Sequence, residues 1–397
     1  MSLENETNLP DLICLSHLRW NFVWQRPQHL LSRFARHRRV FFIEEPIGID
    51  EDKARLEINQ HESGVYVVVP HIPHAEWQSH ENLQRAFVDE LLQRHKIDNY
   101  FLWFYTPMAM GFADHLEPLA VVYDCMDELS AFRNAPQTIK DREKELFRRA
   151  HLVFTGGESL YEAKKEQHER VYAFPSSIEV EHFAKARNIT VDPADQQSIA
   201  HPRLGFFGVV DERFDINLLD RIAELRPDWQ FVIIGPVVKI SESDLPRRAN
   251  IHYLGGKSYQ ELPNYIAGWD VALLLFALNE STRFISPTKT PEYLAAGCPV
   301  VSTPIRDVVR PYGEMGLVHI ADTPEGFVQA CEEALKEDRR ERLNKVDLFL
   351  AKNSWDKTFE KMADLVDQAI ETRKSEHNGQ VENARSEAEV NYEKVGQ

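Results

Sequence analysis

Short apolar runs alternate with longer amphipathic stretches along the first half of the chain. Helical patterns, such as RPQHLLSRFARH at residues 26–37 and NLQRAFVDELLQRH at residues 82–95, lie between most of these runs. Continuous apolar runs between helices are typical of strands buried on both faces, and therefore of a parallel sheet covered by helices. Strands are predicted at residues 12–15, 40–43, 65–69, 101–105, 121–123, 152–155 and 171–174.

This alternation stops near residue 178 and resumes near residue 204. Residues 179–203 are polar with little periodicity, which indicates a linker. The pattern therefore predicts an α/β protein with two tandem Rossmann-like domains, residues 1–178 and 204–354, that face each other across a cleft. Strands of the second domain are predicted at residues 204–210, 231–234, 251–253, 271–276, 300–303 and 316–320.

The end of the chain shows one more amphipathic pattern and then loses its large apolar residues. SWDKTFEKMADLVDQAIETR predicts a helix over residues 355–372. Residues 373–397 are mostly polar, so we expect a disordered tail there.

Charge and composition narrow the classes of partner. The 397 residues carry a formal net charge of −17, which disfavours binding to nucleic acid. Residues 12–43 contain no acidic residue and six arginines, which indicates either a solvated helix face or an anion or membrane surface. The four cysteines are scattered and the longest apolar run is 271–278, so we expect a cytoplasmic protein, with the inner face of the membrane as an alternative place.

The stretch SPTKTPEYLAAGCPVVST, residues 286–303, carries the sharpest chemical signal. Thr290 followed by Pro291 can start a helix, and Gly297 can end it. The free backbone N–H groups of a helix start attract phosphate, and Lys289 adds a positive charge there. The carboxylate of Glu292 can accept two hydroxyl donors from a ribose, so the pair predicts a nucleotide diphosphate site. A Lys–Glu surface pair is the alternative.

Other nucleotide and metal motifs are absent from the sequence. No G-x-G-x-x-G follows the first strand, and no G-x-x-x-x-G-K-[ST] occurs. Asp50, Glu51 and Asp52 lie in a polar loop and are expected to be a solvated charge run. We therefore expect no metal site and no cofactor besides a nucleotide diphosphate sugar as donor substrate.

The stretch at 286–304 resembles the nucleotide-sugar motif of the GT-B retaining glycosyltransferases of family 4, also called glycosyl transferases group 1. VYAFPSSIEVEHF resembles the hinge segment of that family, and LGFFGVVDERFD resembles the glycine turn that opens its second domain. SWDKTFEKM resembles the terminal helix that crosses back onto the first domain. The resemblance is closest to members of the teichuronic-acid and exopolysaccharide type.

The resemblance implies roles for individual residues of the second domain. Glu292 matches the ribose-binding glutamate of the E-x7-E motif, whereas Phe284 stands where the family has the first glutamate. Gly208 and Arg213 match the glycine turn and a phosphate-binding basic residue. The remaining positions are Ser286, Thr288 and Lys289 at the diphosphate, and Leu254, Gly255 and Lys257 beside the base.

The first domain is expected to hold the acceptor and the catalytic groups. Asp124 and Asp127 follow the fifth predicted strand at the cleft, where an aspartate can act as a general base or orient a sugar hydroxyl. Helix capping is the alternative for Asp127. His17 is a third candidate, with a structural role as its alternative. Arg26, Trp20 and Trp24 are candidates for acceptor contacts, although core packing explains at least one of the tryptophans.

These observations predict a glycosyltransferase that moves a sugar from a nucleotide diphosphate sugar to a glycan or lipid-linked acceptor in cell-surface polysaccharide biosynthesis. Two alternatives stay open. One is a nucleotide-sugar epimerase of the same architecture, and the other is a non-catalytic nucleotide-sugar-binding subunit.

Overall fold

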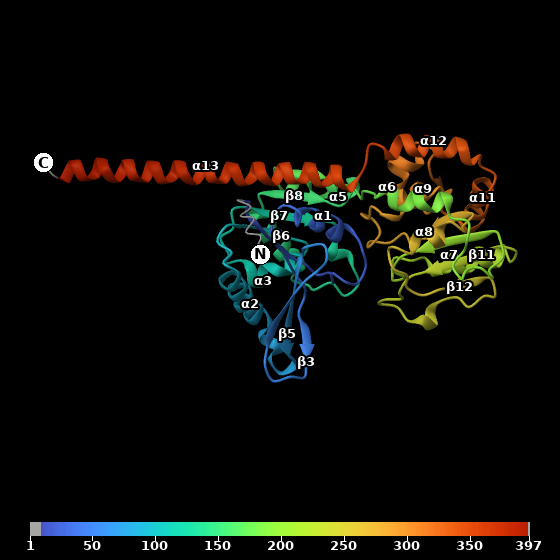
Figure 1. Cartoon of the computed structure of the whole chain (residues 1–397), viewed down its shortest axis with the longest axis horizontal. Helices are drawn as coiled ribbons and strands as arrows, with labels where there is room; N and C mark the ends of the chain where they lie inside the picture. The colour runs from blue at the N-terminus through green and yellow to red at the C-terminus, as the bar shows by residue number, and fades with distance from the viewer. Residues whose placement is uncertain (1–8, 396–397) are drawn as a thin grey trace, which may run out of the picture.

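The computed structural model describes the backbone of residues 9–395 and the side chains of residues 9–376. Two domains, each built on a sheet with helices on both faces, lie side by side, and a long C-terminal helix runs along the first (Figure 1). The prediction of two Rossmann-like domains is confirmed.

The first sheet has nine strands within the described residues, in the order β3-β5-β2-β1-β6-β7-β8-β9, with β4 antiparallel to β5 and the other pairs parallel. All seven predicted strands are present. The bounds are β1 Asp11–Leu15, β2 Val40–Ile43, β3 Ile47–Ile49, β4 Arg55–Gln60, β5 Tyr66–Pro73, β6 Tyr100–Phe104, β7 Val121–Cys125, β8 Leu152–Thr155 and β9 Val171–Ala173.

Sequence analysis missed β3 and β4, which are short or polar and lie at the edge of the first sheet. β4 reads RLEINQ and is at least partly exposed along its whole length, so it lacks the buried apolar run that marks the other strands. The loop between the two strands holds Asp50, Glu51 and Asp52, which is the polar loop expected for them.

The second sheet is entirely parallel within the described residues, in the order β12-β11-β10-β13-β14-β15. All six predicted strands are present, and β10 lies at the centre as the first strand of a doubly wound sheet does. The bounds are β10 Arg203–Phe207, β11 Gln230–Ile234, β12 Ile251–Tyr253, β13 Val271–Leu274, β14 Val300–Ser302 and β15 His319–Ile320.

Helices cover both faces of each sheet, and each sheet has an apolar core cluster on either side. In the first domain the helices are α1 Arg26–Phe34, α2 His80–His95, α3 Met110–Ala113, α4 Ile139–Arg149 and α5 Glu158–Lys164. The later helices are α6 Val180–Ala184, α7 Ile216–Leu225, α8 Leu262–Ile266, α9 Lys289–Ala296, α10 Arg306–Val308, α11 Pro324–Ala334, α12 Arg339–Leu350 and α13 Trp355–Val395.

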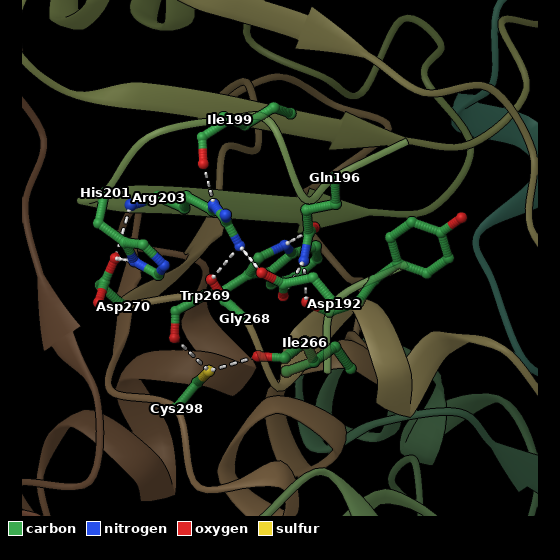
Figure 2. Close-up of polar contacts among 11 residues, drawn as sticks. Asp192, Gln196, Ile199, His201, Arg203, Ile266, Gly268, Trp269, Asp270 and Cys298 are labelled. Atoms are coloured by element: carbon green, nitrogen blue, oxygen red, sulfur yellow. Dashed lines mark hydrogen bonds and ion pairs between the residues drawn. The ribbon is translucent and has the colours of Figure 1, made fainter. Parts of the chain in front are cut away.

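The predicted linker, residues 179–203, is instead an ordered part of the second domain. Phe183 and Ile199 are buried in the core cluster of that domain. Figure 2 shows how the end of the segment is fixed: Arg203 pairs with Asp192 at 2.7 Å, and Trp269 Nε1 donates to Gln196 Oε1 at 3.0 Å. The polar composition of the segment predicted a loose linker. In the structure these polar side chains form hydrogen bonds inside the fold, which composition alone does not reveal.

The C-terminal helix α13 crosses back to the first domain as predicted. Trp355, Met362, Val366 and Ile370 are buried in the same cluster as residues of β1 and α1. The predicted tail differs, because α13 continues as one helix to Val395 and extends beyond the domain (Figure 1). Residues 373–395 lack proline, and eleven of these 23 residues are Glu, Ala, Lys or Arg, which are good helix formers. Residues 396 and 397 lie outside the described part.

The arginine-rich run of residues 12–43 is paired with acidic side chains from other parts of the fold. Its members therefore do not form a free cationic face. The pairs are Arg19–Glu44, Arg26–Asp124, Arg33–Asp356, Arg36–Asp356, Arg38–Asp367 and Arg39–Asp11. Among the helices of the described residues, none has both the length and the apolar character needed to cross a membrane.

Candidate functional site

Helix α9 places the two residues that carried the strongest prediction. It begins at Lys289, with Thr288 as its N-cap, and ends at Gly297, which has a left-handed φ of 88°. The start lies two residues before the expected Pro291, which occupies an early helical position where its missing N–H is not needed. Thr290 through Ala296 are buried, so the helix start is held rigidly against the second domain core.

Lys289 lies directly against the glycine turn after β10. A Cβ added to Gly208 would fall 2.1 Å from Lys289 Cε, so only glycine leaves room for this side chain. Gly208 has a φ of 140°, and its backbone also faces Gly235, whose added Cβ would fall 1.8 Å from the Gly208 carbonyl oxygen. A cation and a glycine turn therefore lie together at the end of β10.

Glu292 is 7% exposed, and its Oε2 atom accepts no hydrogen bond from the described residues. Burial raises the pKa of this carboxyl to about 7, while the charge of Lys289 opposes the rise. Burial also lowers the pKa of Lys289, and Glu292 opposes that change. An unpartnered carboxylate oxygen in a buried site is suited to accept a hydroxyl hydrogen from a ligand.

Asp127, from the first domain, lies near the same site. Burial raises the pKa of its carboxyl, and the nearby charges of Arg213, Arg26 and Lys289 oppose the rise. Arg213 and Lys289 belong to the second domain, so a first-domain carboxyl and two second-domain cations share one region between the sheets. Such a carboxyl is suited to take or position a proton.

Asp124 is engaged in a different way. It is fully buried and forms a bidentate pair with Arg26, with Arg26 Nε at 3.1 and 3.0 Å from its two carboxylate oxygens and Nη2 at 2.8 Å from Oδ1. Arg26 Nη1 also donates to the carbonyl oxygen of Phe174 at 2.7 Å. The pair therefore links β7, α1 and the end of β9 to one another, which gives Asp124 and Arg26 a structural role beside the site.

Arg213 donates three side-chain hydrogen bonds to Asp211, at 3.0, 3.2 and 2.7 Å. Its guanidinium carbon lies 5.4 Å from the ring centroid of Phe132, which belongs to the first domain. Lys239 Nζ lies 4.9 Å from the same ring. Sequence analysis missed Phe132 and Lys239 because neither lies in a recognisable motif.

Comparison with known proteins identifies the second domain. Residues 201–337 match the family described as Glycosyl transferases group 1. The second domain is a glycosyl transferases group 1 domain.

A curated protein is similar to part of the chain. TuaH of Bacillus subtilis (strain 168), assigned as a teichuronic acid biosynthesis glycosyltransferase, is 26% identical over 263 residues, which cover 60% of this chain. The match covers 64% of that relative, which is less than two thirds of its length.

Solved structures share the arrangement of the two domains. Sucrose-phosphate synthase from Thermosynechococcus elongatus aligns with a TM-score of 0.67 at 13% identity, covering 91% of this chain and 99% of that chain. Anabaena HepE in complex with UDP-glucose aligns with a TM-score of 0.64 at 13% identity, covering 90% and 99%. The E. coli trehalose-6-phosphate protein bound with UDP-2-fluoro glucose aligns with a TM-score of 0.65 at 14% identity, covering 89% and 98%. The chain therefore has the GT-B fold.

The predicted base-binding residues of the group 1 domain follow β12. Leu254 packs on the core of the domain, and Gly255 has a φ of 69° with open space where a Cβ would lie. Lys257 Nζ pairs with Asp195 at 2.6 Å, so its charge is partly satisfied inside the domain. Gly255 also accepts a hydrogen bond from the Gly235 N–H at 2.8 Å, which links this edge to the Gly208 turn.

The segment before α9 contacts the first domain. The carbonyl oxygen of Ser286 accepts a hydrogen bond from Ser176 Oγ at 2.5 Å. Phe284, at the position of the first motif glutamate, packs against the apolar cluster of the first domain. The side chain that replaces the first motif glutamate therefore contributes to the contact between the two domains.

The predicted acceptor residues fall into two groups. Trp20 is 2% exposed and packs on Phe42 with ring centroids 5.1 Å apart, as a core residue does. Trp24 is only partly buried and lies 6.2 Å, centroid to centroid, from Tyr259 of the group 1 domain. Trp24 is therefore the better placed of the two for a ligand between the domains.

His17 lies after β1, on the first-domain side of the site. Burial lowers the pKa of its imidazole to about 4, with a further lowering from the charge of Lys239. Its Nδ1 atom has no hydrogen-bond partner among the described residues. A neutral imidazole with a free nitrogen can exchange a hydrogen bond with a ligand hydroxyl. Within residues 9–376, no group of three or more His, Cys, Asp or Glu side chains is arranged to hold a metal ion.

Proposed function

We propose that this chain is a glycosyltransferase that moves a sugar from a nucleotide diphosphate sugar to a glycan or lipid-linked acceptor in cell-surface polysaccharide biosynthesis. The single observation that carries the proposal is the position of Lys289 and the unpartnered carboxylate of Glu292 on one turn of α9, against the glycine turn at Gly208. The similarity to TuaH supports the polysaccharide setting.

In this proposal the group 1 domain binds the donor. Lys289 and the first N–H groups of α9 contact the diphosphate, and Glu292 accepts the ribose hydroxyls. Arg213 and Lys239 add charge near Phe132, where the leaving diphosphate develops negative charge. Ser286 and Thr288 border the diphosphate, and Leu254, Gly255 and Lys257 border the base.

The first domain presents the acceptor hydroxyl. Asp127 takes or orients its proton, and His17 or Trp24 contacts the acceptor sugar. The close approach of the domains at Phe132 and Arg213 excludes water, which limits hydrolysis of the donor. We propose a cytoplasmic location, with the inner face of the membrane as the alternative if the acceptor is lipid-linked.

The test is a transfer assay with a panel of labelled nucleotide diphosphate sugars and a lipid extract as acceptor. The proposal predicts a labelled lipid or glycan that forms with the wild type and that falls by about two to four orders of magnitude in rate with Asp127→Asn. A labelled epimer formed from donor without acceptor would instead favour an epimerase.

A second candidate is a non-catalytic nucleotide-sugar-binding subunit. Phe284 favours it, because an apolar side chain occupies the position where the family has a sugar-contacting glutamate. Donor binding without transfer to any acceptor fraction would support this candidate against the first.

A further inference from the structure

A cavity of about 800 Å³ lies beside the predicted donor site, between the two domains and the start of α13. Residues from the end of β9, the α10 region and α13 line it, and the segments that connect the domains form part of its wall. Ser286 also lines it, three residues before Lys289. Neither Lys289 nor Glu292 lines the cavity, so it is separate from the pair that carries the proposed function.

The floor of the cavity contains polar groups that lack partners. Asp307 is 6% exposed, and its Oδ1 atom accepts a hydrogen bond from the Ser159 N–H at 3.0 Å. Its Oδ2 atom has no hydrogen-bond partner among the described residues, and the same is true of Ser177 Oγ, although Ser177 is only 4% exposed. Burial raises the pKa of Asp307. Buried polar atoms without partners are expensive, and ligand hydroxyls would satisfy them.

The opposite wall is basic. Lys352, Lys357 and Lys361 are exposed and line the cavity, and Lys357 and Lys361 lie one helical turn apart on α13. Lys357 Nζ donates to the carbonyl oxygen of Ala351 at 2.7 Å, which fixes the side chain near the cavity mouth. Asp364 adds an acidic group to this wall, whereas Glu158 and Arg310 line the cavity elsewhere. The whole lining then holds four basic and three acidic side chains, a small surplus of positive charge.

Aromatic rings complete the lining. Tyr172 and Phe174 come from the first domain, whereas Tyr312 and Phe349 come from the second. The rings of Tyr312 and Phe349 lie 5.2 Å apart, centroid to centroid. Flat apolar rings beside a carboxylate and a basic wall suit a ligand that has both ring faces and hydroxyl groups together with a negative charge.

We propose that this cavity is a second saccharide site, which binds a sugar unit that carries a carboxylate or a phosphate. The ring of the sugar lies on the aromatic residues, its hydroxyl groups donate to Asp307 and Ser177, and its anionic group faces Lys357 and Lys361. The contacts proposed for this sugar use neither Lys289 nor Glu292. Ser286 lines the cavity and also borders the proposed diphosphate, but it makes none of these contacts, so the site can be tested apart from the proposed transfer reaction.

Isothermal titration of the full chain, without donor, tests this site. The probes are a hyaluronan tetrasaccharide, which carries glucuronate, neutral maltotetraose, and glucose 6-phosphate. We expect the hyaluronan tetrasaccharide or glucose 6-phosphate to bind more tightly than maltotetraose, and the one that does so identifies the source of the anionic group. The preference should disappear at high salt, because the lysines are exposed and screened.

Two variants locate the binding. Lys357→Ala combined with Lys361→Ala should weaken the acidic probe by about fivefold and leave maltotetraose unchanged. Lys374→Ala, an exposed lysine on the same helix that does not line the cavity, is the matched control and should have no effect. Equal affinity for acidic and neutral probes, binding of none of them, or unchanged binding by the double variant would each overturn the proposal. Normal donor binding in the same samples would show that such a failure concerns this site alone.

Discussion

The side chain of Lys289 lies across the backbone of Gly208, so that a methyl group on Gly208 would fall 2.1 Å from Lys289 Cε. This contact joins the start of α9 to the turn after β10 and makes the position of the cation depend on the absence of a side chain. A substitution at Gly208 should therefore displace the Lys289 ammonium group without removing it.

Gly208→Ala is expected to displace Lys289 and to strain a backbone with φ of 140°. Affinity for nucleotide diphosphate sugars should fall by at least tenfold, because a charge-assisted hydrogen bond contributes about 1.5–3 kcal/mol. Titration calorimetry measures the affinity, and circular dichroism checks that the fold is retained. Gly316→Ala is the matched control, because Gly316 also has a positive φ, of 65°, a Cβ there meets open space, and the residue is not assigned to the donor. Equal affinities in the two variants would contradict the role of Gly208.

The buried carboxyl of Glu292 should make stability depend on pH. Its pKa is about 7 in the folded protein against an ordinary 4.5, so the folded state holds its proton more tightly than the unfolded state does. Stability from this group is therefore complete below about pH 4.5 and is lost as pH rises through 7. Glu292→Gln removes the effect and should be more stable than the wild type at pH 8 by up to about 3 kcal/mol.

Thermal melting of both proteins between pH 5 and pH 8 measures this difference, because the titration of all other groups is common to the pair. The gap in melting temperature should widen in favour of the Gln variant as pH rises. A gap that stays constant with pH would show that Glu292 is not a buried carboxyl of raised pKa.

Asp124 and Asp127 should respond differently to the same substitution. Asp124→Asn leaves the buried Arg26 without its charge partner, which costs about 3–5 kcal/mol of stability and lowers the melting temperature by about 10 °C. Asp127→Asn should leave stability unchanged or raised, because burial already disfavours its charge, and should slow transfer by about two to four orders of magnitude. Differential scanning calorimetry and the transfer assay separate the two, and loss of stability in both variants would refute the distinction.

The sequence predicted the parallel strands well because they are continuous apolar runs, and it grouped Lys289 with Glu292 because both lie on one helical turn. The sequence did not show which of Trp20 and Trp24 packs in the core. The burial of Trp20 in the structure identifies it as the core residue. A sequence pattern predicts a feature well when all the residues that form the feature lie in one helix or strand.

Contacts between distant segments could not be predicted in this way. Arg26 and Asp124 are 98 residues apart, and nothing local marks them as partners. Phe132 and Lys239 meet across the domains, and Lys239 has a left-handed φ of 64° that its residue type does not suggest. The segment 179–203 looked like a linker because its few apolar residues lack periodicity, yet Phe183, Ala186 and Ile199 among them are buried in the second domain.

The central claim is that Lys289 at the start of α9 holds the diphosphate of a nucleotide sugar. Its most direct measurement is the dissociation constant of the best-bound member of a panel of UDP-, GDP- and dTDP-sugars, determined by titration calorimetry for the wild type and for Lys289→Ala. Lys345→Ala, a lysine on the surface of α12, serves as the control. We expect Lys289→Ala to weaken binding by about one to two orders of magnitude while the control binds as the wild type does. Binding by Lys289→Ala that equals the wild type, or no binding of any donor by the wild type, would contradict the account.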